Sequence, residues 1–405
     1  MPPTPRPGFA HRLSRVELAA SVRMSIKARE LKAAGKPVIT LTTGEPNFDS
    51  PAQAIEAAHQ AALKGDTKYP PQDGTRALKE AIQRKFKRDS GLDYALDEIC
   101  VSNGGKQALF NAIMATVDPD DDVVIPVPSW IAYAQMVQLC GGNPVLVTCP
   151  QNNGFKPRPE DIDAAVTPRT KWLILNNPNN PTGACCSADE LAAIAAVMRK
   201  HPHVWLLSDD MYEHLVFDEF RHATLAQVAP DLKDRTLTVS GVSKTYAMTG
   251  WRVGFAGGPQ DLIKAMTVMQ GQATAGISTV GQAAAAAALD GPQDGVTEQI
   301  IAYQRRRDLA VEMLNASRGI SCHKPEGAFY VFPNVAGLLG KTTNGGRTLH
   351  NDEDICLALL EEVHVATVHG AAYHMSPYLR ISTATADDDL AEGLRRIQTF
   401  CEELR

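Results

Sequence analysis

The sequence predicts an α/β protein that combines a large domain, built on a mostly parallel β-sheet, with a smaller α+β domain. Between residues 99 and 240, short β-branched runs alternate with segments of helical periodicity, which is typical of βαβ units. After about residue 290 this alternation gives way to a long charged helix followed by mixed strands and helices. A chain of 405 residues is long enough to form two such cores.

The first expected helices precede the sheet. A helix is expected over residues 16–35, because Gly35 and Pro37 together form a helix stop. Two further helices are expected over residues 52–63 and 75–89, with a polar turn between them.

Apolar strands then follow at short intervals. The expected strands cover residues 99–103, 122–127, 171–176, 203–209 and 236–240. The helices expected after the first three strands cover residues 105–117, 130–140 and 188–199. Because the functional groups of a parallel sheet lie at the carboxyl ends of its strands, the residues just after each strand are the candidates for a site.

The chain divides into three segments in this interpretation. Residues 1–47 form an N-terminal arm and helix that belong to the small domain, because they precede the large sheet. Residues 48–292 form the large domain. Residues 293–405 form the small C-terminal domain, with helices expected over about 293–315 and 353–363 and from Asp387 onward.

The composition is that of an ordinary globular protein. Apolar residues make up 44% and charged residues 21%, and a net charge of −6 lacks the basic surplus of a nucleic-acid binder. No apolar run approaches the ~18 residues of a membrane span, and the proline-rich N-terminus lacks the apolar core of a secretory signal. Eight cysteines without a C-x-x-C pair indicate reduced thiols in a cytoplasmic protein, and neither a disulfide framework nor a metal site.

The stretch Ser240–Phe255, SGVSKTYAMTGWRVGF, places Lys244 among small residues just after an expected strand. A lone lysine in a turn is by default a surface residue. An amine at a strand end can nevertheless condense with an aldehyde when its surroundings keep part of it deprotonated. Arg252 would then hold a charged handle on that aldehyde, and a phosphate is the natural candidate. This pattern is expected of a lysine that binds pyridoxal phosphate.

Such a cofactor needs an acidic partner for its ring nitrogen and donors for its phenolic oxygen. Asp209 follows an apolar run, and a carboxylate there would keep the pyridine nitrogen protonated; a helix N-cap is the alternative role. Tyr212 would donate to the phenolic oxygen, with a core tyrosine as the alternative. In NNPNNPTG, residues 176–183, two prolines fix the backbone around Asn180, although a plain turn is also common.

The cofactor also needs a flat side chain against its ring and a cradle for its phosphate. Trp130 would stack against the ring. Gly104, Gly105 and Lys106 open a helix just after a strand, where backbone N–H groups bind phosphate. Arg380 lies in the apolar strand YLRISTA, where an arginine needs a carboxylate partner, either from a substrate or from an internal salt bridge.

Together these strings resemble the fold-type I pyridoxal-phosphate enzymes, and among them the class I and II aminotransferases. TGEP, NNPNNPTG, SDDMYEHL, the Lys244 stretch and YLRISTA occur in the family's order over nearly the whole chain. The resemblance implies a seven-stranded, mostly parallel sheet in the large domain and a small domain that closes over the substrate. It also implies a homodimer with active sites at the interface.

The resemblance further implies roles for individual residues. Lys244 would bind pyridoxal 5′-phosphate covalently, and the implied catalytic residues are Lys244, Asp209 and Tyr212. The other implied cofactor contacts are Gly104, Gly105, Lys106, Trp130, Asn180, Ser243 and Arg252, together with Tyr69 reaching in from the partner subunit. The implied substrate contacts are Gly44, Trp130, Asn180 and Arg380, of which Arg380 would bind the α-carboxylate.

GGKQALFN most resembles a bacterial subgroup of aspartate aminotransferases, some of which also accept prephenate. In that subgroup the lysine matching Lys106 binds the distal carboxylate of the substrate. Its first helix also supplies small hydroxyl residues; here only Ser21 matches, Ala19 stands where a serine would, and Arg23 would supply charge instead. Gly241 replaces a phosphate-binding serine, which the subgroup tolerates.

The resulting hypothesis is a two-stage amino transfer from an L-amino acid, with aspartate or glutamate first, to 2-oxoglutarate or oxaloacetate. Three alternatives stay open. The first is the same reaction with aromatic or neutral amino acids or with prephenate. The second is a pyridoxal-phosphate-dependent lyase that eliminates a β-substituent. The third is a non-catalytic cofactor-binding regulator, for which the chain offers neither a DNA-binding domain nor the charge.

Overall fold

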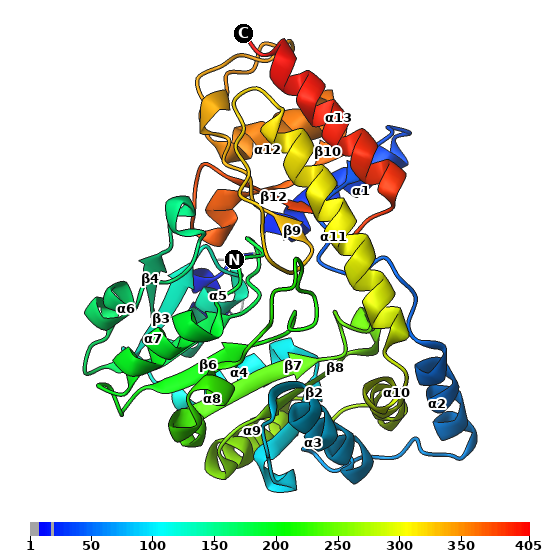
Figure 1. Ribbon diagram of the computed structural model, residues 1–405, viewed down its shortest axis with the longest axis vertical. Helices are drawn as coiled ribbons and strands as arrows, with labels where there is room; N and C mark the ends of the chain where they lie inside the picture. Colours follow the sequence, from blue (N-terminus) through cyan, green and yellow to red (C-terminus); the bar gives the residue numbers. More distant parts are fainter. Residues whose placement is uncertain (1–7, 18–19) are drawn as a thin grey trace, which may run out of the picture.

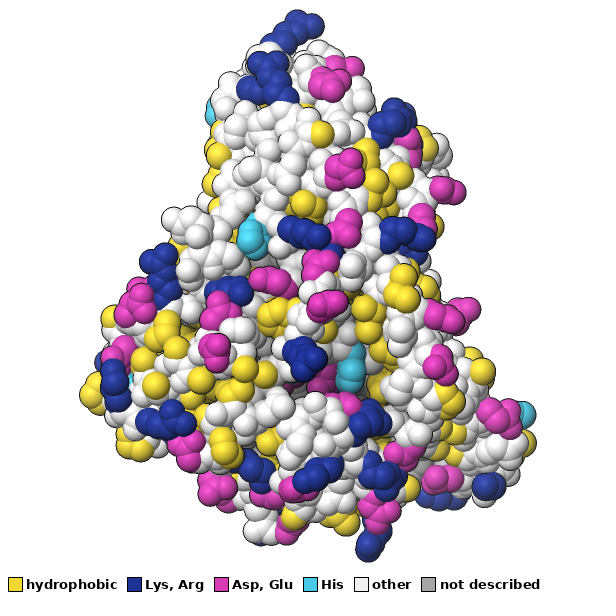
Figure 2. Space-filling view, viewed as in Figure 1, with side chains coloured by type: hydrophobic (Ala, Val, Ile, Leu, Met, Phe, Trp, Pro, Cys, Tyr) yellow, Lys and Arg dark blue, Asp and Glu magenta, His cyan; other side chains and the backbone are white. Residues whose placement is uncertain are grey.

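The computed structural model describes residues 8–17 and 20–405, apart from the side chain of Ser21. Figure 1 shows a broad lower body around a β-sheet and a narrower upper body, with the long helix α11 (Asp294–Asn315) running between them. Acidic and basic side chains are interspersed over the face seen in Figure 2. Within the described residues, none of the helices combines the length and apolar character needed to cross a bilayer.

The lower body is organised around a seven-stranded sheet with the strand order β2-β8-β7-β6-β5-β3-β4. Its strands are β2 (Ile99–Asn103), β3 (Asp122–Val127), β4 (Asn143–Thr148), β5 (Thr170–Asn176), β6 (Trp205–Asp209), β7 (Thr236–Gly241) and β8 (Val253–Gly257). Among these strands only β8 runs antiparallel to its neighbours. Asn176, Asp209 and Val239 are in register, so the ends of β5, β6 and β7 lie side by side. The predicted mostly parallel sheet is confirmed.

Two of these strands, β4 and β8, are not evident from the hydrophobic pattern. A Cβ atom on Gly254 of β8 would lie 2.1 Å from the backbone nitrogen of Gly105, so the strand must carry a glycine there. Glycine weakens a strand pattern because it adds no side chain to pack. β4 is an edge strand that contains Pro144 and is mostly exposed or half-buried, and proline in a strand is confined to such edges.

Helices cover both faces of the sheet (Figure 1). They are α2 (Ala52–Leu63), α3 (Arg76–Ser90), α4 (Gly105–Thr116), α5 (Ala132–Cys140), α6 (Pro159–Ala165), α7 (Ala188–Met198), α8 (Leu225–Val228), α9 (Gln260–Ala273) and α10 (Thr279–Asp290). Ile125 and Ile174 join one apolar core, whereas Val124 and Leu173 join another, as the alternation of side chains along a strand requires. Each such fully buried side chain contributes roughly 1.5–3 kcal/mol to the stability that fixes the strand ends.

The upper body has an apolar core of its own. Its elements are α1 (Ala20–Ala33), β1 (Ile39–Thr40), β9 (Tyr330–Val331), α12 (Asp352–Glu362), β10 (Val365–Ala366), β11 (Val368–His369), β12 (Leu379–Ser382) and α13 (Asp387–Glu403). Met24 of α1 and Leu41 belong to one cluster with Leu359 and Leu394. β1 also pairs in parallel with β10, which joins the N-terminal segment to the C-terminal one. The predicted domain boundaries after residues 47 and 292 stay predictions.

The N-terminal helix begins later than the predicted residue 16. α1 starts at Ala20, and a 3₁₀ turn, η1 (His11–Arg15), ends in extended backbone at Val16. The side chain of Gln135 on α5 donates a hydrogen bond of 2.8 Å to the carbonyl oxygen of Glu17. This contact holds the arm against the lower body, so the helix does not extend back to residue 16.

Candidate active site

Lys244 lies in the turn that follows β7, at the carboxyl edge of the sheet. Its Nζ donates a hydrogen bond to the carbonyl oxygen of Gly44, on the segment after β1. Burial lowers the pKa of the Lys244 amine to about 8; Glu45 partly opposes this effect and Arg380 adds to it. At pH 8 about half of the amine is therefore neutral and able to attack an aldehyde.

Asp209 ends β6 and is buried beside this amine. Its Oδ2 accepts a hydrogen bond of 2.5 Å from the hydroxyl of Tyr133, and its Oδ1 accepts one of 3.2 Å from the backbone N–H of Met211. Burial raises the pKa of the Asp209 carboxyl to about 6, although both hydrogen bonds lower it. Both donors are neutral, so neither cancels the negative charge of the carboxylate. The carboxylate can therefore pair with a protonated ring nitrogen.

We expect Tyr133→Phe to change the pH profile of kcat/KM, so that the loss of activity on the acid side of the profile occurs at higher pH. The Tyr133 hydroxyl lowers the pKa of Asp209, so its removal raises that pKa and Asp209 loses its charge at a higher pH. One hydrogen bond to a charged group is worth about 1.5–3 kcal/mol, which corresponds to a movement of about one to two pH units. Tyr94→Phe is the matched control, because the Tyr94 hydroxyl is also buried and pairs with Thr238 at 3.2 Å. An unchanged acid side of the profile in Tyr133→Phe would contradict this prediction.

Arg380 projects from β12 and is buried. Its Nη1 donates to Asn180 Oδ1 at 3.2 Å and its Nη2 donates to the carbonyl oxygen of Thr42 at 2.6 Å, whereas its buried Nε has no hydrogen-bond partner. The rings of Tyr330 and Tyr373 lie 4.6 and 5.2 Å from the guanidinium carbon. Within the described residues, no carboxylate forms an ion pair with Arg380, so the internal salt bridge considered above is not present. A buried guanidinium in this state is suited to bind a carboxylate from outside.

Tyr212 and Gly44 both lie next to a second tyrosine, Tyr330. The hydroxyls of Tyr212 and Tyr330 lie 3.0 Å apart, and the ring of Tyr212 lies 6.0 Å from Lys244 Nζ. A Cβ atom on Gly44 would lie 3.0 Å from the Tyr330 hydroxyl, so the glycine leaves room for this pair. Burial raises the pKa of Tyr212 well above its usual value, and its hydroxyl therefore stays a donor.

The start of α4 has the geometry that suits an anion. Gly104 caps the helix with φ of 77°, and a Cβ atom there would lie 2.5 Å from Arg252 Nη2. The guanidinium thus lies over the helix N-terminus, where N–H groups and the helix dipole favour a phosphate. Ser243 is buried directly before Lys244. A Cβ atom on Gly241 would lie 3.1 Å from the Cα of Gly254, so a serine at that position would require β7 and β8 to move apart by a few tenths of an ångström.

Lys106 and Trp130 lie together beside this helix start. Lys106 Nζ is 4.9 Å from the centre of a Trp130 ring, which in turn meets Tyr133 edge-on at 5.5 Å. Burial, helped by Arg252, lowers the pKa of the Lys106 amine. Lys106 and Arg252 line an open cleft of about 400 Å³.

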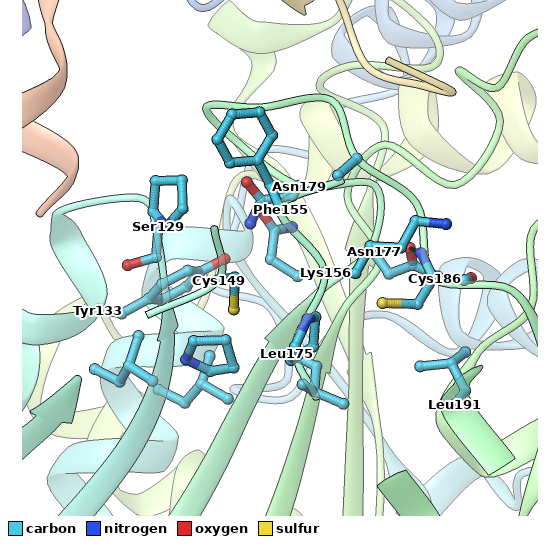
Figure 3. A pocket seen from close by; sticks show the side chains of 17 residues that line it. Ser129, Tyr133, Cys149, Phe155, Lys156, Leu175, Asn177, Asn179, Cys186 and Leu191 are labelled. Carbon is cyan, nitrogen blue, oxygen red and sulfur yellow. Dashed lines mark hydrogen bonds between the residues drawn. The ribbon is translucent and has the colours of Figure 1, made fainter. Parts of the chain in front are cut away.

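A separate, small cavity lies under the loop that follows β5 (Figure 3). It is lined by Tyr133, Asn177 and the thiols of Cys149 and Cys186. Its volume of about 30 Å³ holds about two water molecules and is too small for a cofactor. Burial raises the pKa of both thiols to about 12, so they stay protonated at neutral pH.

Two predicted site residues, Tyr69 and Arg23, have exposed side chains in this chain, and a third is not described. Tyr69 is 94% exposed on the loop between α2 and α3. Arg23 is half-exposed and forms an ion pair of 3.8 Å with Glu17. The side chain of Ser21, like residue Ala19, lies outside the described residues.

Sequence reasoning missed Tyr133, Tyr330 and Asn176. Asn176 Oδ1 accepts from the backbone N–H of Asn180 at 2.8 Å, and its Nδ2 donates to the carbonyl oxygen of Asp209 at 2.9 Å. The sequence does contain a signal for this residue, because it begins the string NNPNNPTG. The two tyrosines lie among apolar neighbours and therefore look like ordinary core residues.

The residues of this site fit pyridoxal 5′-phosphate. Lys244 supplies an amine for the aldehyde, Asp209 a carboxylate for the ring nitrogen, and the Gly104 turn with Arg252 a phosphate site. The buried Nε of Arg380, which has no hydrogen-bond partner among the described residues, is suited to bind a carboxylate.

Sequence comparisons point in the same direction. Residues 36–397 match the family described as aminotransferase class I and II. The chain is 52% identical to an aspartate aminotransferase of Rhizobium meliloti (strain 1021) over 395 residues, which cover 98% of this chain and 96% of that relative. It is also 52% identical to an aspartate/prephenate aminotransferase of Cereibacter sphaeroides over 392 residues, which cover 97% of this chain and 98% of that relative.

Solved structures share the whole fold. The crystal structure of the aspartate aminotransferase from Rhizobium meliloti matches with a TM-score of 0.96 and 52% identity, over 98% of this chain and 100% of that one. The Thermus thermophilus aspartate aminotransferase with maleate matches with a TM-score of 0.91 and 38% identity, over 98% of this chain and 100% of that one. These likenesses confirm the fold class that the sequence predicts.

Proposed function

Because this chain belongs to the class I and II aminotransferases, we propose that it uses pyridoxal 5′-phosphate to move the amino group of an L-amino acid to a 2-oxo acid. Aspartate or glutamate is the proposed donor, and 2-oxoglutarate or oxaloacetate the proposed acceptor. The observation that carries this proposal is that an amine with a lowered pKa and an unpaired guanidinium lie close enough to interact. The amine is that of Lys244, whose pKa Arg380 helps to lower. The guanidinium is that of Arg380, which lacks a carboxylate partner among the described residues.

When bound, pyridoxal 5′-phosphate supplies an electron sink for the bond between the α-carbon and its hydrogen. Lys244 Nζ takes the α-proton as a general base and returns it as a general acid. Asp209 would keep the ring nitrogen of the bound cofactor protonated, and the Tyr212 hydroxyl would donate to its phenolic oxygen. Arg380 and Asn180 hold the α-carboxylate, which orients the α-hydrogen toward Lys244.

Lys106 is proposed to bind the second carboxylate of a dicarboxylate substrate. Its ammonium lies beside Trp130 and lines the cleft that Arg252 also lines. Burial lowers the pKa of the Lys106 amine, which means that its charge is incompletely solvated and gains by pairing with an anion. The names of the relatives, aspartate and aspartate/prephenate aminotransferase, support a dicarboxylate as substrate.

A single-turnover experiment tests this assignment. Cofactor-loaded protein is mixed with each L-amino acid in turn, without an acceptor, and the change in cofactor absorbance is followed. Lys106→Ala should lower kcat/KM for aspartate and glutamate about 10- to 100-fold, since a hydrogen bond to a charged group is worth about 1.5–3 kcal/mol. Lys64→Ala, which removes an exposed lysine after α2, is the control. Equal losses with alanine or phenylalanine as donor would contradict a role in binding the second carboxylate.

The same experiment separates the alternatives. Reaction only with aromatic or neutral donors would keep the aminotransferase and remove the dicarboxylate preference. Reverse transfer onto prephenate would add that acceptor, which the name of the Cereibacter sphaeroides relative favours. Release of ammonia in the absence of an added 2-oxo acid acceptor would indicate a lyase, and no spectral change with any donor would indicate a regulator.

The homodimer and the cytoplasmic location also belong to this proposal. The exposed ring of Tyr69 supports the dimer, because an aromatic side chain that is 94% exposed is suited to contact a second subunit. Light scattering of the purified protein measures the oligomeric state directly.

A further inference from the structure

A buried group of charged side chains lies directly behind the two loops that carry Tyr212 and Lys244. Lys85 of α3 donates to Glu213 Oε2 at 2.5 Å and lies 3.7 Å from Asp89 Oδ2. The Lys85 and Glu213 side chains are only 2% and 6% exposed. A buried charge is costly unless it is paired, so this group has few alternative arrangements.

The group is connected to both loops. Glu213 directly follows Tyr212, and its Oε1 accepts a hydrogen bond of 2.5 Å from Ser240 Oγ at the end of β7. His214 Nδ1 lies 3.3 Å from the hydroxyl of Thr245, which directly follows Lys244. α3 therefore fixes the loop after β6 and the loop after β7 to the same support.

His214 links Asp89 to the loop after β7. Its Nε2 lies 3.1 Å from Asp89 Oδ2, and a carboxylate only accepts, so Nε2 carries a hydrogen. Its Nδ1 lies 3.3 Å from the Thr245 hydroxyl, which can either donate to a ring nitrogen or accept from it. Contacts therefore run from Asp89 through His214 to Thr245.

The charges within the group balance. Arg88 donates to Asp89 Oδ1 at 2.7 Å, so two cations, Lys85 and Arg88, face the two carboxylates. Burial would raise the pKa of Glu213, but Lys85 and the nearby histidines hold it below its usual value. The group is therefore a closed ionic network at neutral pH.

A metal site is the other interpretation of these residues. Ligand atoms of Asp89, Glu213 and His214 all lie within 4.8 Å of one another. Lys85 Nζ, however, lies 2.5 Å from the Glu213 carboxylate and 3.7 Å from that of Asp89. The ammonium group already takes the position that a metal ion would need, so the cluster is a salt-bridge network.

We propose that Glu213, His214 and Thr245 are positioning residues that hold the Lys244 amine against Tyr212 and Asp209. This inference rests on the proposed function, in which Lys244 binds the cofactor. None of the network's residues is among those to which the proposed function assigns a substrate or cofactor contact. It sets the relative position of the two loops, and a small displacement between reacting groups lowers a rate strongly.

Two variants test the proposal. Thr245→Val removes the hydroxyl with little change in shape, and the double variant Lys85→Met/Glu213→Gln removes the ionic link while keeping the site neutral. In cofactor-free protein, labelling of Lys244 by trace acetic anhydride at pH 8 should slow about threefold, because a freed amine returns toward its ordinary pKa. In the loaded protein, kcat should fall about tenfold while KM changes about twofold or less, because positioning acts on the reacting geometry. In both variants, the pH at which the absorbance of the bound cofactor has changed by half should also shift.

Controls separate positioning from stability. Thr245→Ser should restore wild-type labelling, because it restores the hydroxyl. Thr236→Val removes another buried hydroxyl at the opposite end of β7, which donates to the carbonyl oxygen of Leu232 at 2.7 Å, and should leave both readouts unchanged. If the double variant does not fold, Thr245→Val alone decides.

The outcomes also distinguish this inference from the proposed function. If the wild-type protein forms no cofactor adduct on Lys244, the proposed function fails and the inference falls with it. If the adduct forms but Thr245→Val and the double variant keep the wild-type labelling rate and the wild-type pH of half-change in absorbance, the network is purely structural and only the inference is overturned.

Discussion

Replacing Lys244 by alanine is expected to lower the rate of amino transfer by about 10⁴-fold, because the variant loses both the amine that binds the cofactor and the base that moves the α-proton. The readout is the single-turnover change in cofactor absorbance with aspartate as donor. The variant also leaves the carbonyl oxygen of Gly44 without its donor, so circular dichroism and a thermal melt must show that it is folded.

Two controls sharpen this experiment. Lys264→Ala removes an exposed lysine of α9 and should leave the rate unchanged. Methylamine added to Lys244→Ala should restore part of the lost rate, because it supplies a small free base in the space that the side chain leaves. Turnover near the wild-type rate in Lys244→Ala without added amine would remove this residue from the mechanism.

Asp209→Asn is the second variant with a large expected effect, a loss of about 10²- to 10³-fold in kcat. A neutral amide cannot keep the ring nitrogen protonated, and electrostatic stabilisation of this kind is worth several kcal/mol. The shape of the side chain is retained and the amide oxygen can still accept from Tyr133, whereas the weaker hydrogen bond from the backbone N–H of Met211 is lost together with the charge. Asp209→Glu keeps the charge at a changed distance and should lose less.

Asp210→Asn is the matched control for Asp209→Asn. Asp210 is the next residue and is just as buried, but its Oδ1 accepts from Ser208 at 2.8 Å and lies 3.7 Å from His222. Similar losses in both variants would mean that any buried carboxylate at the end of β6 is needed for folding, and the specific role of Asp209 would be wrong.

Much of the fold and of the site follows from local sequence rules. The ends of β5, β6 and β7 can be predicted because each apolar run stops at a polar residue, and the rule for parallel sheets then places Asn176, Asp209 and the Lys244 turn at one edge. The helix start at Gly105 is likewise local, since a glycine pair follows a strand.

Other features depend on contacts between distant segments. No local rule places Gln135 of α5 against the carbonyl of Glu17, so the start of α1 is misjudged. Tyr330 lies more than a hundred residues from Tyr212 in the chain, and only the pairing of β9 with β12 brings it to the site. Tyr69 and Arg23 lie on exposed parts of the chain, so the packing of the described residues does not assign either of them to the site.

The close approach of β8 to α4 limits how this site can change during evolution. A side chain at position 254 would strike the backbone at Gly104 and Gly105, and a side chain at position 104 would strike Arg252. A change at position 254 would displace the helix start, and a change at position 104 would displace the Arg252 side chain that lies over it. Both glycines are therefore expected to be kept wherever this arrangement is used. In a divergent relative, glycine at both positions would indicate a phosphate site better than any single charged residue.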